Sequence, residues 1–357
     1  MTSPDRARRV REALLAWYDR AGRDLPWRGA RDPYATWVSE VMLQQTRVDT
    51  VVPYYRRFLQ RFPDVERLAR APLEQVLETW AGIGYYGRAR SLHSAAREVV
   101  ERYGGELPQE AAALQKLPGI GRYTAGAIAS IAFGKRTPVL DGNATRVLSR
   151  LIAHQGGIPE LWEEAEKLVP DERPGDFNQA LMDVGATVCL PRRPDCLVCP
   201  LVRLCEARRQ GLEEQIPRAR VRRKQRDARA AVALCERKGL LLVVRRPAHG
   251  LLAGMWDFPS FDVAEGEDAR AVLSRGVRVE LGLVGEPGEA LPEVRHVFTH
   301  IKLRCVPFRV GVRSGRARTE RYAEVRWARP KQIERLAISK LARRLLAAYA
   351  ASRGSDR

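Results

Sequence analysis

The stretch KLPGIGRYTAGAIAS, residues 116–130, decides the fold of the first part of the chain. Gly119 and Gly121 flank one isoleucine, and alanines and isoleucines with helical spacing follow Tyr123. Glycine lets a backbone turn sharply and approach another molecule closely. The N–H groups at the start of the second helix point outward, where the helix dipole favours an anion. The stretch therefore predicts a hairpin of two helices, which is either a plain structural turn or a binding site for phosphate groups.

The composition indicates a protein of two domains with a polyanionic partner. The chain has 357 residues, and 62 Lys and Arg against 43 Asp and Glu give a formal net charge of +19. This excess favours nucleic acid, with membrane headgroups as the second interpretation. The sequence contains no run of about 18 apolar residues, which is the length that could span a bilayer. Because Asp5, Glu12 and Asp19 interrupt the Arg-rich first helix, a targeting peptide is not expected, and we predict a cytoplasmic protein associated with the nucleoid.

The periodicity of apolar residues changes once along the chain. Residues 1–215 have almost entirely helical spacing, and a run rich in arginine follows within residues 216–229. Beyond it, residues 230–246, 297–312 and 323–328 have the composition of strands, whereas 268–276 and 338–350 are again helical. We therefore predict a helical domain over 1–215, a basic linker over 216–229 and an α+β domain over 230–357.

Four cysteines lie within residues 189–205 in a C-x6-C-x2-C-x5-C spacing. These residues are Cys189, Cys196, Cys199 and Cys205. Four thiolates this close, two of them in a C-x2-C pair, predict a metal centre, and both zinc and a [4Fe–4S] cluster accept such a set. Cys235 and Cys305 lie alone in the second domain and are expected to be small buried side chains.

Two acidic residues have unusual surroundings. Asp141 precedes a predicted helix, where it is either an ordinary N-cap or a catalytic anion whose pKa the helix dipole lowers. Glu40 lies in the apolar helical run WVSEVMLQQTRV, residues 37–48. It is either an exposed surface residue or a buried acid whose raised pKa keeps it protonated. One protonated and one ionised carboxyl group are the pair that cleavage of a glycosidic bond requires.

These motifs together resemble a known family of enzymes. LPGIGRYTAG (117–126), VLDGN (139–143) and the cysteine spacing are similar to the helix-hairpin-helix DNA glycosylases that contain a [4Fe–4S] cluster. DLPWR (24–28), WVSEVMLQQTRV, GIGYYGRARSLH (82–93) and the second domain resemble the MutY adenine DNA glycosylases. The resemblance implies a mainly α helix-hairpin-helix domain with an iron–sulfur module at 189–205, followed by an α+β Nudix-like domain. It also implies a monomer that excises adenine opposite 8-oxoguanine or guanine in double-stranded DNA.

The resemblance also implies roles for individual residues. Glu40 corresponds to the general acid that protonates adenine at N7, and Asp141 to the anion that supports the sugar cation. Asn143 would hold the catalytic acid and water network, and Tyr123, where the family also has serine, would pack near both. The four cysteines would bind the cluster. The residues implied to contact DNA or a base are Leu25, Trp27, Arg28 and Gln179 in the adenine pocket, Gln45 and Tyr85 as wedges, Gly119 and Gly121 at the backbone, and Phe298, Thr299 and His300 at 8-oxoguanine.

Three alternatives remain at this point. A bifunctional glycosylase/lyase for oxidised pyrimidines needs a lysine nucleophile where this chain has Tyr123. A Nudix hydrolase needs a cluster of acids on a helix to bind Mg²⁺, but SRGVRVELGL (274–283) has Gly276 and Val279 where further acids should be. In a non-catalytic DNA-binding protein, Glu40 and Asp141 would be ordinary solvated or capping acids.

Overall fold

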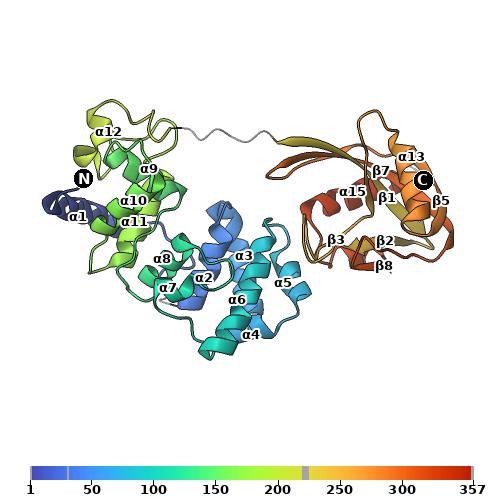
Figure 1. The fold of residues 1–357 in the computed structure, drawn as a ribbon, viewed down its shortest axis with the longest axis horizontal. Helices are drawn as coiled ribbons and strands as arrows, with labels where there is room; N and C mark the ends of the chain where they lie inside the picture. The colour runs from blue at the N-terminus through green and yellow to red at the C-terminus, as the bar shows by residue number, and fades with distance from the viewer. Residues whose placement is uncertain (1, 30–31, 219–224, 355–357) are drawn as a thin grey trace. The chain divides into compact units, whose positions relative to one another are not determined.

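The computed structural model describes residues 2–29, 32–218 and 225–354 (Figure 1). Two compact units make up the chain. The first comprises Met1–Arg70 and Ser91–Val221, and the second comprises Ala71–Arg90 and Arg222–Arg357. Residues 219–224 of the predicted basic linker lie outside the described residues, and its last four residues begin a strand.

Helices make up the first unit. They are α1 (Pro4–Ala21), α2 (Pro33–Leu43), α3 (Val48–Arg61), α4 (Val65–Arg70), α6 (Gly87–Tyr103), α7 (Ala111–Leu114), α8 (Arg122–Ile131), α9 (Gly142–Leu151), α10 (Ile158–Leu168), α11 (Pro174–Thr187), the 3-10 helix η1 (Val202–Leu204) and α12 (Glu206–Arg209). Local signals start the helices that matter for the site. Asp32 caps α2 by accepting hydrogen bonds from the backbone of Tyr34 and Ala35, and Asp141 caps α9 in the same way through Ala144.

The predicted hairpin joins α7 to α8. Gly119 adopts a φ of +77°, and a Cβ atom there would lie 2.5 Å from Cβ of Ser91, so both conformation and space require glycine. Gly121 is the N-cap residue of α8. Because glycine has no side chain, the N-cap residue provides no side-chain acceptor for the N–H groups in the first turn of this helix. The sequence prediction of a glycine hairpin between helices is therefore confirmed.

A mixed sheet forms the centre of the second unit, which also contains α5 (Leu73–Trp80). Its elements are β1 (Arg226–Arg237), β2 (Leu240–Arg245), β3 (Trp256–Asp257), β4 (Ser260–Asp262), α13 (Ala269–Val279), β5 (Leu283–Ala290), β6 (Val294–Val297), β7 (Ile301–Gly315), β8 (Glu324–Ala328), α14 (Pro330–Ile333) and α15 (Lys340–Gly354). The main strand order is β3-β2-β1-β7-β5, in which β1 and β7 are parallel and the other neighbours are antiparallel.

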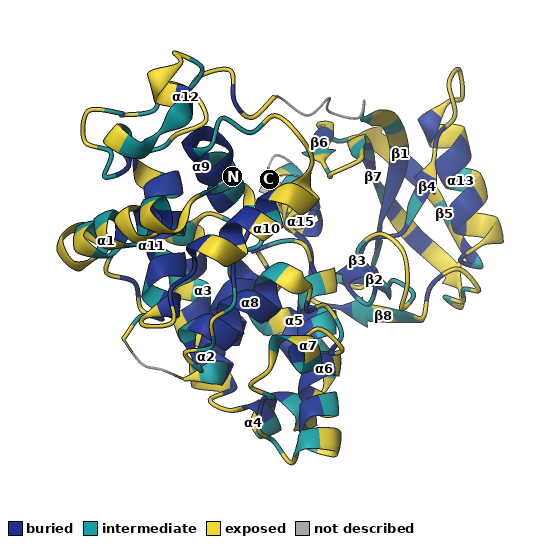
Figure 2. Cartoon of the chain, turned by 60° about the vertical axis from the view of Figure 1, so that its left-hand side comes forward, coloured by how far each residue is buried: buried dark blue, intermediate teal, exposed yellow. Residues whose placement is uncertain are grey.

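Alternate residues of β1 face two separate cores of this sheet. Val232 and Leu234 pack with residues of α15, whereas Ala233 and Cys235 pack with residues of α13. One helix therefore covers each face, and the central strands are buried on both sides (Figure 2). Cys235 and Cys305 are 0% and 1% exposed, which confirms that they are core residues.

The architecture confirms the predicted fold class of a helical hairpin domain followed by an α+β domain. In the described ranges, none of the helices is both long enough and apolar enough to cross a membrane.

Candidate active site

A cavity of about 980 Å³ in the first unit contains most of the predicted site. Helix α2, the loop before it, the start of α8, the start of α9 and helix α11 provide its walls. The predicted residues that line it are Leu25, Trp27, Arg28, Glu40, Gln45, Tyr123, Asp141, Asn143 and Gln179. Segments far apart in the sequence thus place two carboxyl groups, a phenol, three amides and an arginine of the predicted set around one space.

Glu40 is the buried acid of the cavity. It lies in the third turn of α2, where every residue from Tyr34 to Met42 is buried, and it is 4% exposed. Burial raises the pKa of Glu40 to about 7, although the hydrogen bond from Tyr123 opposes this shift. The surface alternative for Glu40 is therefore wrong. The carboxyl group can both hold and release a proton near neutral pH, as a general acid must.

Asp141 is both an N-cap and a wall of the cavity. Its Oδ1 accepts a hydrogen bond of 2.6 Å from the backbone N–H of Ala144. The prediction that the helix N-terminus lowers its pKa is wrong in direction. Burial raises the pKa of Asp141, and hydrogen bonds from Ala144 and Asn143 only partly oppose this effect. The desolvation of a largely buried carboxylate outweighs the helix dipole here.

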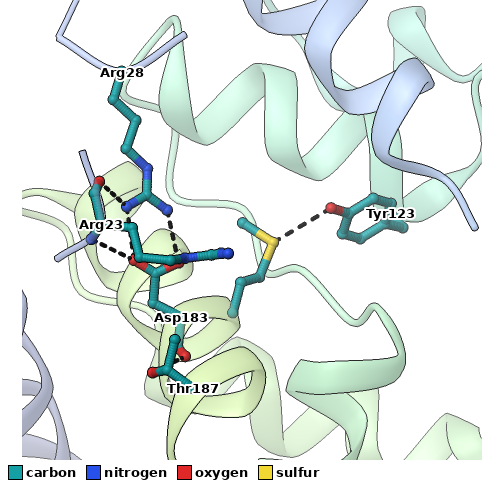
Figure 3. Close-up of polar contacts among 6 residues, drawn as sticks. Arg23, Arg28, Tyr123, Asp183 and Thr187 are labelled. Carbon is teal, nitrogen blue, oxygen red and sulfur yellow. Dashed lines mark hydrogen bonds and ion pairs between the residues drawn. The ribbon is translucent and has the colours of Figure 1, made fainter. Parts of the chain in front are cut away.

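Tyr123 links α8, which begins at the hairpin, to α2, which contains Glu40. Its hydroxyl group lies 2.6 Å from Oε2 of Glu40 and 3.3 Å from the sulfur of Met182, toward which the ring points in Figure 3. The phenol donates to the carboxylate oxygen, and burial together with the charge of Glu40 raises the pKa of Tyr123 well above its ordinary value. Tyr123 therefore remains a neutral hydrogen-bond donor at the acid.

Asn143 connects Asp141 to its own helix and to α11. Hydrogen bonds from its backbone and side chain lower the pKa of Asp141. Its side-chain oxygen accepts a bond of 2.9 Å from Arg146. A Cβ atom at Gly185 of α11 would lie 2.6 Å from Cβ of Asn143, so this glycine provides the space in which the asparagine lies. The amide is thus held on two sides.

A buried ion-pair group that sequence reasoning missed supports the wall of the cavity. Arg23 and Arg28 converge on the carboxylate of Asp183 (Figure 3), with contacts of 2.5 and 2.7 Å. Asp183 is fully buried, and the hydrogen bonds from Arg28 and Arg23 keep its pKa low despite that burial. The signal that could have found it is the spacing of four between Gln179 and Asp183, which places both on one face of α11.

Gln45 lies at the rim of the cavity, outside the helix in which it was predicted. Helix α2 ends at Leu43, and Gln45 adopts a left-handed φ of +57° two residues later. Its side chain is exposed. The sequence could not reveal this break, because the apolar spacing of WVSEVMLQQTRV continues into the next helix.

The second unit has a cavity of about 500 Å³ that contains the remaining predicted contacts. Tyr85, Phe298, Thr299 and His300 line it together. Tyr85 is 46% exposed at a left-handed φ of +50°. The turn from Phe298 to Ile301 is closed by a backbone bond of 2.8 Å between these residues, and Gln225 donates to its carbonyl groups. Thr299 and His300 are exposed on a turn whose backbone carbonyl groups accept hydrogen bonds from Gln225.

The four cysteines of the first unit line one small cavity of about 20 Å³. In the part of the chain that the structure describes, no three His, Cys, Asp or Glu side chains come close enough to hold a single metal ion. Arg150 on α9 lies against this cavity and is 2% exposed. It donates to the sulfur of Cys189 at 3.3 Å and to three backbone carbonyl groups. Among the described residues, no carboxylate forms an ion pair with this buried guanidinium.

The chain is similar in sequence to known proteins. The profile of the HhH-GPD superfamily of base excision DNA repair proteins matches residues 38–170, and that of the NUDIX domain matches residues 230–348. The adenine DNA glycosylase of Homo sapiens is 40% identical over 95% of this chain and 73% of its own length. The chain belongs to the adenine DNA glycosylase family. It is accordingly a DNA glycosylase of base excision repair.

Solved structures extend this result to the first unit. A thermostable thymine-DNA glycosylase is 33% identical, with a TM-score of 0.54 over 58% of this chain and 98% of its own. A non-covalent endonuclease III–DNA complex is 25% identical, with a TM-score of 0.52 over 59% of this chain and 99% of its own. Family membership and these likenesses support binding of this enzyme to DNA, in agreement with its net charge of +19.

Proposed function

We propose that the enzyme hydrolyses the N-glycosidic bond of adenine that lies opposite 8-oxoguanine or guanine in double-stranded DNA, and that it does not cleave the strand. The observation that carries this proposal is the shared cavity of Glu40, Asp141 and Tyr123 in the first unit. A base within a duplex is out of reach of such a cavity, so the adenine must leave the stack and enter it.

In the proposed reaction, Glu40 donates its proton to N7 of adenine while the bond between C1′ and N9 breaks. The electron pair of that bond stays on N9, and adenine leaves as a neutral molecule. Asp141 offsets the positive charge that develops at C1′ and forms a transient bond to this carbon. Water then replaces the Asp141 oxygen at C1′, and the Glu40 carboxylate accepts a proton from that water. A pKa of about 7 suits a group that acts first as acid and then as base.

Leu25, Trp27, Arg28 and Gln179 are proposed to contact the extruded adenine. Their shared cavity supports this role, because it combines apolar side chains that can pack against a base with many polar groups that can form hydrogen bonds with its edges. We further propose that Gln45 and Tyr85 enter the gap left in the duplex. Both are exposed and lie at left-handed backbone positions, where the chain turns away from the preceding element. For Gly119 and Gly121 we propose contact with the DNA backbone at the start of α8.

Recognition of 8-oxoguanine is proposed for the turn of Phe298, Thr299 and His300. The cavity that this turn shares with Tyr85 supports the assignment. Hydrolysis of nucleotides by the same unit is disfavoured by Gly276 of α13, where an acid would be needed. A Cβ atom there would lie 2.3 Å from the ring of Phe261, so a longer side chain does not fit. A binding role for this unit remains.

For the four cysteines we propose a [4Fe–4S] cluster, which would transfer no proton or base in this reaction. The residues fit such a group. A zinc ion would need four sulfurs at about 2.3 Å from one centre, whereas a cluster binds each thiolate to a different iron. The buried charge of Arg150 offsets part of the negative charge of four thiolates, and Arg208 lines the same cavity. Analysis of iron, acid-labile sulfide and zinc in purified protein tests this assignment. Arg150→Met should lose iron, whereas Arg136→Met, which removes bonds to carbonyl groups far from the cysteines, should retain it.

The experiment that tests the proposed reaction is a single-turnover assay with adenine opposite 8-oxoguanine, guanine or cytosine. We expect an abasic strand that is cut only by later alkali, and no adduct after reduction with borohydride. No lysine is among the described residues that line the cavity of Glu40, so no imine should form there. A strong borohydride adduct that disappears when a lysine is replaced would contradict the proposal.

A further inference from the structure

The two adjacent glutamines at the end of α2 have different environments. Gln44 is half-buried, and its Nε2 donates a hydrogen bond of 3.1 Å to Oγ1 of Thr124. Gln45 is exposed, and its backbone adopts a left-handed conformation. One glutamine therefore contacts the protein, and the next is presented at the rim of the cavity.

The backbone of Gln45 needs support from its neighbours. A residue other than glycine at a φ of +57° is strained, and such a conformation persists only where the surrounding structure holds it. The N–H group of Thr46 donates to the carbonyl of Leu43 at 3.2 Å and closes the turn on one side. On the other side of Gln45, the side chain of Gln44 forms a hydrogen bond with Thr124 of α8.

Thr124 is well placed to hold this turn. It is 2% exposed in the first turn of α8, and it directly follows Tyr123, which contacts Glu40. The first turn of α8 thus makes two polar contacts with α2, one to the acid and one to the residue that precedes Gln45. We propose that Gln44 is a positioning residue that, through Thr124, holds Gln45 in the orientation in which it replaces the departing adenine.

This inference rests on the proposed function, in which Gln45 acts as a wedge. It predicts that loss of the Gln44–Thr124 bond impairs extrusion of the base and leaves the ionisation of Glu40 unchanged. A hydrogen bond of ordinary strength corresponds to roughly a 3- to 10-fold change in an equilibrium. We expect an effect of that size on extrusion.

The test uses 2-aminopurine at the target position opposite 8-oxoguanine, bound by full-length protein that carries Glu40→Gln. Fluorescence then reports unstacking of the base without excision. Thr124→Val keeps the side-chain shape but removes the acceptor, and it should lower the extruded fraction. Thr124→Ser keeps the hydroxyl group and should restore it. Gln44→Met should match Thr124→Val, and neither change should add to the effect of Gln45→Ala, because contacts in one chain of interactions are not additive.

Ser130→Ala is the matched control, since Ser130 lies on the same helix, is 1% exposed and accepts a hydrogen bond of 2.8 Å from Asn178. It should lower the unfolding temperature without changing extrusion. Equal losses of extrusion in Ser130→Ala and Thr124→Val would overturn the inference, as would additive effects with Gln45→Ala.

With active Glu40, the pH dependence of excision should be the same in Thr124→Val and wild type. Failure of the wild-type chain to excise adenine would contradict the proposed function, while the fluorescence comparison would still decide the role of Gln44.

Discussion

The hydroxyl group of Tyr123 lies 2.6 Å from Oε2 of Glu40 and lowers the pKa of an acid that burial alone would raise further. The two residues come from helices α8 and α2 and are 83 positions apart in the sequence. The contact therefore adjusts the proton affinity of the proposed general acid without adding a charge.

Replacing Tyr123 by phenylalanine should shift the pH dependence of excision. Glu40 must be protonated to act, so the single-turnover rate falls as pH rises through its pKa of about 7. Without the phenol hydrogen bond this pKa rises, and the alkaline limb should move to higher pH. A pH series on wild type and Tyr123→Phe checks the direction. A limb at the same or a lower pH would show that Tyr123 does not lower the pKa of Glu40.

Glu40→Gln should slow excision by orders of magnitude and stabilise the fold at neutral and alkaline pH. Loss of the general acid should lower the single-turnover rate by roughly 100- to 10,000-fold, with binding to the mispair retained. The folded pKa is about 7 against an ordinary 4.5, so burial of the ionisable Glu40 carboxyl group costs up to about 3 kcal/mol of folding free energy. This cost is absent below pH 4.5, grows between these values and is complete above about 7.

Denaturation of both proteins at pH 4.5 and pH 8 measures the stability effect. The gain from Glu40→Gln should appear at the higher pH alone. An equal gain at both values would mean that the substitution acts through packing.

Asp183→Asn should destabilise the first unit and weaken the adenine pocket. The change leaves Arg23 and Arg28 without their buried counterion, which typically costs about 3 kcal/mol. Chemical denaturation measures this loss, and titration of the mispair measures the effect on binding. Asp176→Asn is the control on the same helix. Its partner Arg173 is 45% exposed, so less than about 1 kcal/mol should be lost.

Thr299→Ala should reduce the preference for adenine opposite 8-oxoguanine over adenine opposite guanine. Its hydroxyl group is exposed on the turn that lines the cavity of the second unit. Loss of one hydrogen bond should lower the ratio of the two rates roughly 3- to 10-fold. Thr299→Ser should keep the ratio, and Ser314→Ala, an exposed hydroxyl on β7 outside this cavity, should not change it. An unchanged ratio in Thr299→Ala would place recognition elsewhere.

Local patterns in the sequence were sufficient for most elements and drew attention to several residues that line the cavity of the first unit. Gly119 marks the hairpin because the turn there needs a φ of +77°, which glycine adopts readily. Asp141 marks the start of α9 because its side chain accepts a bond from its own helix. Glu40 is conspicuous because an acid stands among Trp37, Val38, Val41 and Met42, which indicates a buried carboxyl group as one of two interpretations. All three signals depend on neighbours within a few residues, so they can be read directly along the chain.

Tertiary structure alone decided the features that depend on distant neighbours. Asp183 becomes a counterion only because α11 lies beside the loop that contains Arg23 and Arg28, and Gln44 becomes a support only because α2 contacts Thr124. The pKa of Asp141 was predicted in the wrong direction for the same reason. The helix dipole is local and visible in the sequence, but the burial that outweighs it comes from residues brought together by folding. Desolvation and ion pairing depend on distance in space, which the order of residues along the chain does not contain.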